Sequence, residues 1–267
     1  MIQADYHVHT DFSSDSQSPM EDMVKQAIHL GLERVCFTDH MDLDFPKQYE
    51  MRFVFNVEEY WKKLMEMQEN YPQIKILKGI ECGMQPALGK RYEELLSSYE
   101  FDFVINSCHV LFDTDPYYPE FWQERSEKEG VTAYFEGILK NIKELQNFDI
   151  CGHIDYIVRY APSKGKGFSS NDYWDVLDEI LKTTIQMGKG IEVNTSGYKY
   201  GLGRPHPCED ILKRYHELGG EIITVGSDGH QPNHIAYDFD KACELLKFIG
   251  FRYYTVFEKR KPEFLKL

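Results

Sequence analysis

Short apolar segments alternate with longer amphipathic segments along the whole 267-residue chain. The short segments are rich in β-branched and aromatic residues, as strands are, and the longer ones have the 3.6-residue period of helices. We predict strands over residues 4–9, 34–39, 75–81, 102–108, 149–153, 190–195 and 221–227, with a last apolar run near 252–257. We predict helices over residues 19–31, 57–70, 89–98, 131–146, 171–188, 207–218 and 239–249.

This repeated strand-helix unit favours a parallel α/β barrel, with residues 1–267 as a single domain. An open doubly wound sheet is the alternative.

Local signals in the sequence support the helix boundaries. Residues 18–21 (Ser-Pro-Met-Glu) predict a capping box with proline in the first turn, and Asn56 predicts a second N-cap. Gly31 and Gly250 are expected to end helices.

The chain carries 30 Lys plus Arg against 44 Asp plus Glu, a net charge of −14. This acidic field repels nucleic acid, so an anionic ligand needs local positive charge. No apolar run approaches the roughly 20 residues of a membrane-spanning helix, and the first residues lack the pattern of a signal peptide. We therefore expect a cytoplasmic protein with no membrane or nucleic-acid partner; the sequence carries no signal for an oligomeric state.

The cysteines are widely spaced, with no C-x-x-C pair, which is neither a zinc-finger spacing nor a dense disulfide framework. We expect all of them to be buried, reduced thiols. They are Cys36, Cys82, Cys108, Cys151, Cys208 and Cys243.

Each predicted strand ends in a polar or ionisable side chain. In a parallel barrel the carboxyl ends of the strands meet at one rim, where catalytic groups gather. His7 and His9, two residues apart, project from the same strand face. Asp15 follows in a loop that can return to the rim. The candidates are His7, His9, Asp15, His40, Glu81, His109, His153, Asp228 and His230.

So many buried imidazoles and carboxylates are costly unless a cation compensates them. Imidazole and carboxylate ligands suit zinc, manganese or iron, and the absence of a thiolate cluster argues against a closed structural zinc site. Because a catalytic metal usually takes about three protein ligands, nine candidates predict two or three divalent ions.

The ordered motifs resemble those of the polymerase and histidinol phosphatase (PHP) superfamily, and within it the histidinol-phosphate phosphatases. The resemblance extends from residue 5 to about residue 235 and implies a distorted (β/α)7 barrel with a trinuclear metal site. The motifs are H-x-H-x5-D from His7, Thr38-Asp39-His40, Glu81, His109, Gly152-His153 and Ser227-Asp228-x-His230.

The resemblance also implies how the ligands divide. His7, His9, Glu81 and Asp228 would hold one metal; Glu81 would bridge to a second metal held by His109 and His153; Asp15, His40 and His230 would hold the third. Some relatives have histidine where Asp15 stands, which leaves the filling of the third site open.

The implied reaction is hydrolysis of a small-molecule phosphomonoester, L-histidinol phosphate, in histidine biosynthesis, by attack of a metal-bridging hydroxide. The candidate catalytic residues are Asp228, His230 and Arg159. For the phosphate we expect Arg159 and Arg204, since the planar fork of arginine suits that anion. Glu192 and Asn194 share a strand face and are candidates for the pocket.

The aromatic and acidic loop over residues 110–124 has two interpretations. It is either a lid whose Asp113, Asp115, Tyr117 and Tyr118 receive a cationic or aromatic substrate end, or a packing loop at the rim. Asp39 likewise either orients a metal ligand or caps a turn.

Other functions stay open at this point. One is a PHP enzyme that acts on a nucleotide, an oligonucleotide or phosphotyrosine, although the acidic charge disfavours oligonucleotides. Another is a metal-dependent amidohydrolase, for which no lysine matches a ligand position, with Lys78 coming nearest. A third is a non-catalytic metal-binding scaffold, whose expected sign, loss of ligands, is absent from the nine positions.

Overall fold

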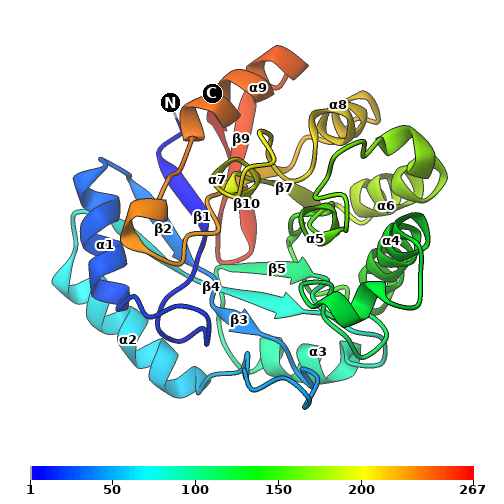
Figure 1. The fold of residues 1–267 in the computed structure, drawn as a ribbon. Helices are drawn as coiled ribbons and strands as arrows, with labels where there is room; N and C mark the ends of the chain where they lie inside the picture. The colour runs from blue at the N-terminus through cyan, green and yellow to red at the C-terminus, as the bar shows by residue number, and fades with distance from the viewer. Residues whose placement is uncertain (1) are drawn as a thin grey trace.

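Seven parallel strands form a nearly closed barrel in the computed structural model, which describes residues 2–267 (Figure 1). They lie in the order β1-β2-β4-β5-β6-β7-β8, and the two-residue β3 pairs with β4 beyond the end of β2. The strands are β1 (Ala4–Val8), β2 (Arg34–Phe37), β3 (His40–Met41), β4 (Lys75–Gly83), β5 (Phe103–Ser107), β6 (Ile150–Cys151), β7 (Gly190–Asn194) and β8 (Ile223–Gly226).

The barrel closes where β1 meets the end of β8. Val8 and Gly229 form a parallel bridge, and the His9 amide donates to the Gly229 carbonyl at 2.9 Å. An open doubly wound sheet has no such contact between its two edge strands. The closure confirms the distorted (β/α)7 barrel.

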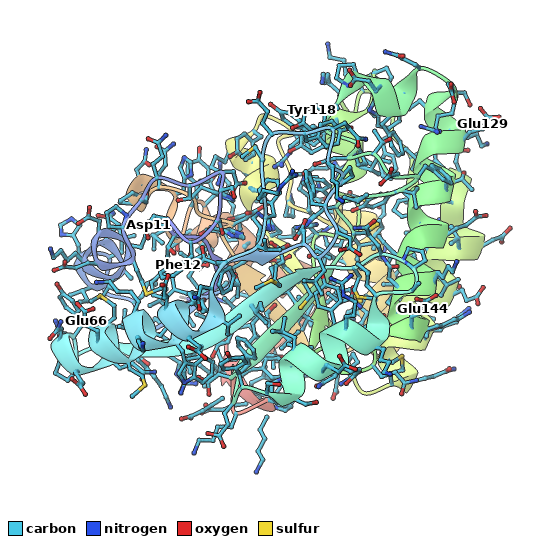
Figure 2. The ribbon with its side chains drawn as sticks, turned by 90° about the horizontal axis from the view of Figure 1, so that it is seen from below. Asp11, Phe12, Glu66, Tyr118, Glu129 and Glu144 are labelled. Atoms are coloured by element: carbon cyan, nitrogen blue, oxygen red, sulfur yellow. The ribbon has the colours of Figure 1, made fainter. Side chains whose placement is uncertain are left out.

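Helices surround the barrel, while the short helices α5 and α7 lie nearer its centre (Figure 1). The helices are α1 (Met20–His29), α2 (Val57–Asn70), α3 (Gly89–Ser97), α4 (Glu127–Glu144), α5 (Ile157–Tyr160), α6 (Trp174–Gln186), α7 (Ser196–Lys199), α8 (Glu209–Glu217) and α9 (Phe239–Ile249). Within residues 2–267, three 3-10 helices lie between them: η1 (Pro119–Trp122), η2 (Ser170–Tyr173) and η3 (Pro232–His234). Figure 2 marks Glu129 and Glu144 on α4 and Tyr118 in the loop before it.

The predicted strands and long helices are present, and the differences lie at their ends. Asn56 caps α2 as expected, accepting from the amides of Glu58 and Glu59. The capping box predicted at residues 18–21 is wrong: the Ser18 hydroxyl donates instead to the His230 carbonyl at 3.0 Å. A true capping box at Ser126 and Glu129 starts α4 four residues earlier than predicted.

The amino-terminal end of the barrel is covered by a hairpin that was only partly predicted. Strands β9 (Tyr253–Glu258) and β10 (Lys261–Lys266) pair antiparallel, and Phe257 packs against Phe103 of β5 with ring centroids 5.2 Å apart. Tyr6 meets the edge of the Phe103 ring at 5.1 Å. Since all three side chains are buried, the hairpin closes the core below the strand ends.

All six cysteines are free and buried, as expected. No helix within residues 2–267 combines the length and the apolar character that crossing a membrane requires.

The Tyr6 hydroxyl ties the hairpin to β1, and its loss should destabilise the fold. It donates to the Phe257 carbonyl at 2.7 Å and accepts from the Phe257 amide at 2.9 Å. Tyr6→Phe leaves both buried backbone groups unpaired, so we expect the free energy of unfolding to fall by about 1–3 kcal/mol in urea titration. Tyr254→Phe is the matched control, because the Tyr254 hydroxyl makes a longer, partly exposed bond to Gln3. Equal stability of the two variants would contradict this role.

Candidate metal centre

Glu81 lies at the centre of the histidine cluster and is fully buried. Its position follows from the sheet register, which pairs Glu81 with His40 of β3 and Ile105 of β5. Each carboxylate oxygen faces imidazole nitrogens from other strand ends. Oε2 lies 3.3 Å from His7 Nε2, 3.5 Å from His9 Nε2 and 2.9 Å from His40 Nδ1; Oε1 lies 3.3 Å from His109 Nε2 and 2.9 Å from His153 Nε2.

Asp228 reaches the same cluster from the turn after β8. Its Oδ1 is 3.4 Å from His9 Nε2, 3.9 Å from His7 Nε2 and 3.6 Å from His230 Nδ1. The backbone of Asp228 is left-handed (φ 52°), a conformation that aspartate adopts more readily than most residues. The Lys199 ammonium and the His230 ring both contact the Asp228 carbonyl, at 2.9 and 3.0 Å, and so support this turn.

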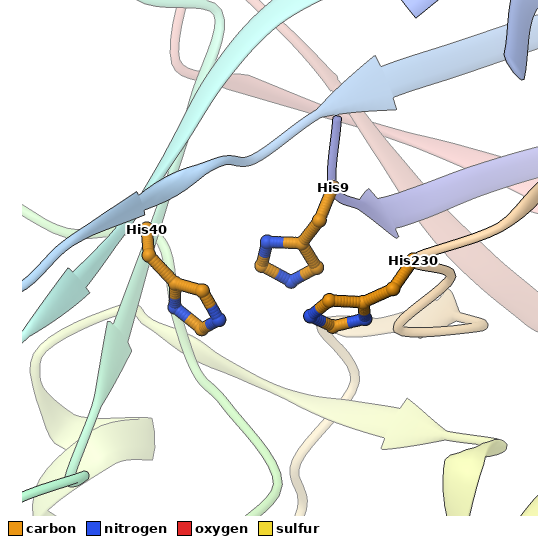
Figure 3. A group of neighbouring side chains, drawn as sticks. All are labelled: His9, His40 and His230. Atoms are coloured by element: carbon orange, nitrogen blue, oxygen red, sulfur yellow. The ribbon is translucent and has the colours of Figure 1, made fainter. Parts of the chain in front are cut away.

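Asp15 does return to the rim, as its place in the loop after β1 predicted. Its Oδ2 lies 3.1 Å from His230 Nε2 and 3.6 Å from His40 Nε2. Figure 3 shows the rings of His9, His40 and His230 close together, and the His9 centroid is 4.2 Å from each of the other two. The nine predicted ligand residues therefore converge on one cluster, which is buried around Glu81 and more open at Asp15.

The outward nitrogens of three of these histidines are held by a second layer of side chains. Glu192 contacts His7 Nδ1 at 2.5 Å, and Asp42 contacts His109 Nδ1 at 2.8 Å. His9 Nδ1 lies 3.2 Å from the Ser13 hydroxyl, which donates to Asp39 at 2.7 Å. Such contacts fix the ring so that Nε2 faces inward.

The second layer includes Asp39, for which the sequence left two roles open, and Asp42, which the sequence analysis did not predict. Asp39 both orients a ring, through Ser13, and supports a turn, accepting from the Thr10 amide at 2.6 Å. Asp42 was not predicted. The sequence feature that could have indicated Asp42 is its position two residues after His40, a predicted ligand at the rim.

The inner atoms of the cluster fit divalent cations. His7 Nε2, His9 Nε2, His40 Nδ1 and Glu81 Oε2 are buried and make no hydrogen bond. Buried polar atoms without partners are costly, and here they face one another. Several overlapping groups of three, such as Glu81 with His109 and His153, have ligand atoms within 4.8 Å of one another.

Carboxylates and imidazoles shift one another's pKa values across the cluster. Burial lowers the pKa of His7 and of His40, but neighbouring carboxylates outweigh it and raise both pKa values well above the usual one. Burial raises the pKa of Glu81, but the neighbouring imidazoles outweigh it and hold that pKa well below its usual value. Burial and the nearby rings of His230 and His40 lower the pKa of His9 well below its usual value. An ionised carboxylate and a neutral imidazole are the forms that bind metals, so the shifts of Glu81 and His9 favour a cation, whereas binding by His7 and His40 would release protons.

The two predicted phosphate arginines have different surroundings. Arg159 lies partly buried beside the cluster, with its Nη1 3.4 Å from the Ser196 hydroxyl. Arg204 instead pairs with Asp155, Nη1 to Oδ2 at 2.6 Å. Burial raises the pKa of Asp155, but Arg204 and His206 outweigh it and hold that pKa at about 2. The charge of Arg204 is therefore already compensated within the protein.

Two predicted pocket residues stand behind the ligands and do not line an open pocket. Glu192 holds His7, as described, and also accepts from the His153 amide at 2.8 Å. The Asn194 amide donates to Asp228 Oδ2 at 3.3 Å. Both side chains are buried, because β7 lies between β6 and β8 and its inward residues meet the two neighbouring strand ends.

The loop over residues 110–124 packs against the segment after β3. The ring of Tyr118 stacks on Tyr49 at 3.8 Å, and the side chain of Asp115 is buried. Tyr117 is exposed and meets Tyr160 at 5.4 Å. Lys78, the nearest match to an amidohydrolase lysine, lies over Trp61 of α2 and outside the cluster.

Comparison with known proteins agrees with this geometry. The PHP domain model matches residues 5–196. A histidinol-phosphatase of Lactococcus lactis is 32% identical over 263 residues, which cover 98% of this chain and 96% of that protein. A probable histidinol-phosphatase of Clostridium acetobutylicum is 33% identical over 259 residues, which cover 96% of this chain and 97% of that protein. A solved structure of the Lactococcus lactis histidinol phosphate phosphatase, complexed with zinc, L-histidinol and phosphate, superposes with a TM-score of 0.90 at 32% identity over 98% of both chains. The chain therefore belongs to the PHP domain family, and along its whole length it is similar to the histidinol-phosphatases of that family.

Proposed function

We propose that this protein is a metal-dependent phosphatase that hydrolyses L-histidinol phosphate to L-histidinol and phosphate. The observation that carries the proposal is the full-length similarity to a relative whose structure holds zinc, L-histidinol and phosphate, together with the convergence of nine histidine and carboxylate side chains here. The activity belongs to histidine biosynthesis. The buried free thiols are compatible with the cytoplasmic location that the sequence led us to expect.

For the ligands we propose three groups, two of which share Glu81. One cation would be held by His7, His9, Glu81 and Asp228, and a second by Glu81 with His109 and His153. Asp15, His40 and His230 would hold a third. The distances support this division, because His109 and His153 face Oε1 of Glu81 and His7 and His9 face Oε2. Asp15 faces His40 and His230.

Zinc, manganese or iron in these groups would supply an activated water and neutralise charge on a transferring phosphoryl group. The protein side chains provide the setting for that chemistry. Glu192 and Asp42 keep His7 and His109 in the ring orientation that binding needs. Arg159 offers a guanidinium beside Asp228 for the non-bridging oxygens of the phosphate.

We further propose that residues 1–267 act as one domain. The β9–β10 hairpin near the carboxyl end of the chain hydrogen-bonds to Tyr6 in β1, and its Arg260 pairs with Asp149 beside β6. Removing the hairpin would therefore open the core beneath the cluster.

Metal removal tests the function directly. Purified protein should release phosphate from L-histidinol phosphate, and a chelator should abolish the release because the buried imidazoles alone supply no activated water. Zinc, manganese or iron should restore it. The assay is phosphate release compared with bound metal per chain. Turnover that persists in the metal-free protein, or none with any of the three metals, would refute the proposal.

Replacing the shared carboxylate tests the ligand assignment. Glu81→Gln keeps the size of the side chain but removes its charge, so we expect less bound metal per chain and a kcat/KM lower by about 100-fold or more. Glu66→Gln, on the exposed face of α2, is the control and should match the wild type in both measurements. Full metal content in Glu81→Gln would show that the cations are held elsewhere.

Replacing Arg159 should weaken substrate binding, whereas replacing Arg204 should lower the stability of the fold. Arg159→Gln should raise the KM for L-histidinol phosphate about 10- to 100-fold, since a charged hydrogen bond to phosphate is lost. Arg204→Gln should mainly lower the free energy of unfolding, by about 1–3 kcal/mol, because it leaves the buried Asp155 with less compensation. Steady-state kinetics and urea unfolding of both variants check this, and the reverse pattern would assign the phosphate to Arg204.

A further inference from the structure

Within residues 2–267, Arg159 differs from most arginines of this protein in forming no ion pair with a carboxylate. Arg34, Arg91, Arg204, Arg214 and Arg260 each form an ion pair with an aspartate or glutamate. Among the residues that the structure describes, the hydrogen bonds of Arg159 go to hydroxyl groups, those of Ser196 and Tyr160. Asp228 acts on this guanidinium through its charge without forming an ion pair, so the hydrogen-bond donors of Arg159 are not taken up by a carboxylate.

Three tyrosine rings surround the Arg159 guanidinium, where the five arginines named above have a carboxylate. The guanidinium carbon of Arg159 lies 5.0 Å from the ring centroid of Tyr156, 4.7 Å from that of Tyr160 and 4.4 Å from that of Tyr200. Within about 6 Å, the negative face of an aromatic ring attracts a cation without carrying net charge itself. These three side chains are called the tyrosine cage below.

The tyrosine cage is anchored to the histidine cluster on one side and to the carboxyl end of β7 on the other. The Tyr156 ring lies 4.8 Å from the His153 ring and 4.9 Å from that of Tyr160. Tyr200 directly follows α7, which begins two residues after β7 ends. The cage therefore holds Arg159 at a fixed place relative to the candidate metal ligands.

A ring and a carboxylate have opposite consequences for an anion that approaches Arg159. A carboxylate would neutralise the guanidinium and repel a phosphate, as Asp155 does for Arg204. Aromatic faces hold the side chain still and leave its positive charge available. The ammonium of Lys199, also near the Tyr200 ring at 4.9 Å, is already hydrogen-bonded to the Asp228 carbonyl.

We infer that Tyr156, Tyr160 and Tyr200 are positioning residues that keep Arg159 free of a counter-ion and aimed at a phosphate dianion. The inference rests on the proposed function, in which Arg159 receives the phosphoryl group. It makes the ring face, and not the hydroxyl, the part of Tyr200 that matters.

Tyr200 is the member of the cage best suited to a test, because it is 52% exposed and its removal leaves the core intact. The experiment is calorimetric titration of inorganic phosphate into zinc-loaded protein, accompanied by kinetics with L-histidinol phosphate. Tyr200→Ala should weaken phosphate binding about 3- to 10-fold, the size expected for a lost cation-ring contact. KM should rise by a similar factor with little change in kcat. Tyr200→Phe keeps the ring and should bind phosphate within about twofold of the wild type.

Tyr253→Ala is the matched control, since this tyrosine is 49% exposed but lies on β9, away from Arg159. It should bind phosphate as the wild type does. Unchanged phosphate affinity in Tyr200→Ala would overturn the inference, as would an equal loss in Tyr200→Phe, which would assign the effect to the hydroxyl. A wild type that binds no phosphate also overturns it. A wild type that binds phosphate with the expected variant effects but does not hydrolyse L-histidinol phosphate would refute the proposed function and leave the cage intact.

Discussion

The contact between Glu81 and five imidazoles is the interaction on which the rest of this structure depends. A carboxylate without solvent access is stable only if positive charge or hydrogen-bond donors surround it. Here these partners come from strand ends or strand-following turns that are far apart in the sequence, so the contact exists only when the barrel is closed. The bridge between Val8 and Gly229 brings the first and last barrel strands together and thereby completes the ring around Glu81.

The second layer explains how so polar a centre keeps one geometry. A histidine ring can rotate and present either nitrogen, and its outward contact decides which one faces inward. Glu192 and Asp42 make that contact directly, and Asp39 makes it through Ser13. Asp42 itself fits only because residue 83 is glycine: a Cβ there would come within 2.3 Å of the Asp42 carboxyl carbon. The backbone packing of β4 and the orientation of His109 are thus coupled.

Sequence patterns predicted the barrel and the gathering of the candidate ligands at its rim because both follow from local rules. Apolar runs located the strands, and in a parallel barrel every strand end reaches the same rim, so His7 and His153 could be grouped without knowing a single contact. Pairing between polar side chains follows no such rule. Arg159 and Arg204 both follow a barrel strand, yet only tertiary structure sets Asp155 against Arg204 and tyrosines against Arg159. The two-residue β3 was missed because it begins soon after β2 ends and has no apolar run of its own.

Because the chain is acidic, positive charge that is not neutralised at the rim is important for binding a phosphate. Asp15, Glu81 and Asp228 place three carboxylates in a centre proposed to receive a phosphate, within a protein of net charge −14. Divalent cations would offset those carboxylates and bind phosphoryl oxygens, and directional hydrogen bonds add to the orientation of the phosphate. A guanidinium with a rigid fork supplies that orientation, provided that no carboxylate competes for it. The neutral rings around Arg159 meet this condition, because they hold the guanidinium without neutralising its charge. An ion pair like that of Arg204 with Asp155 would neutralise it, and the fold contains both kinds of environment.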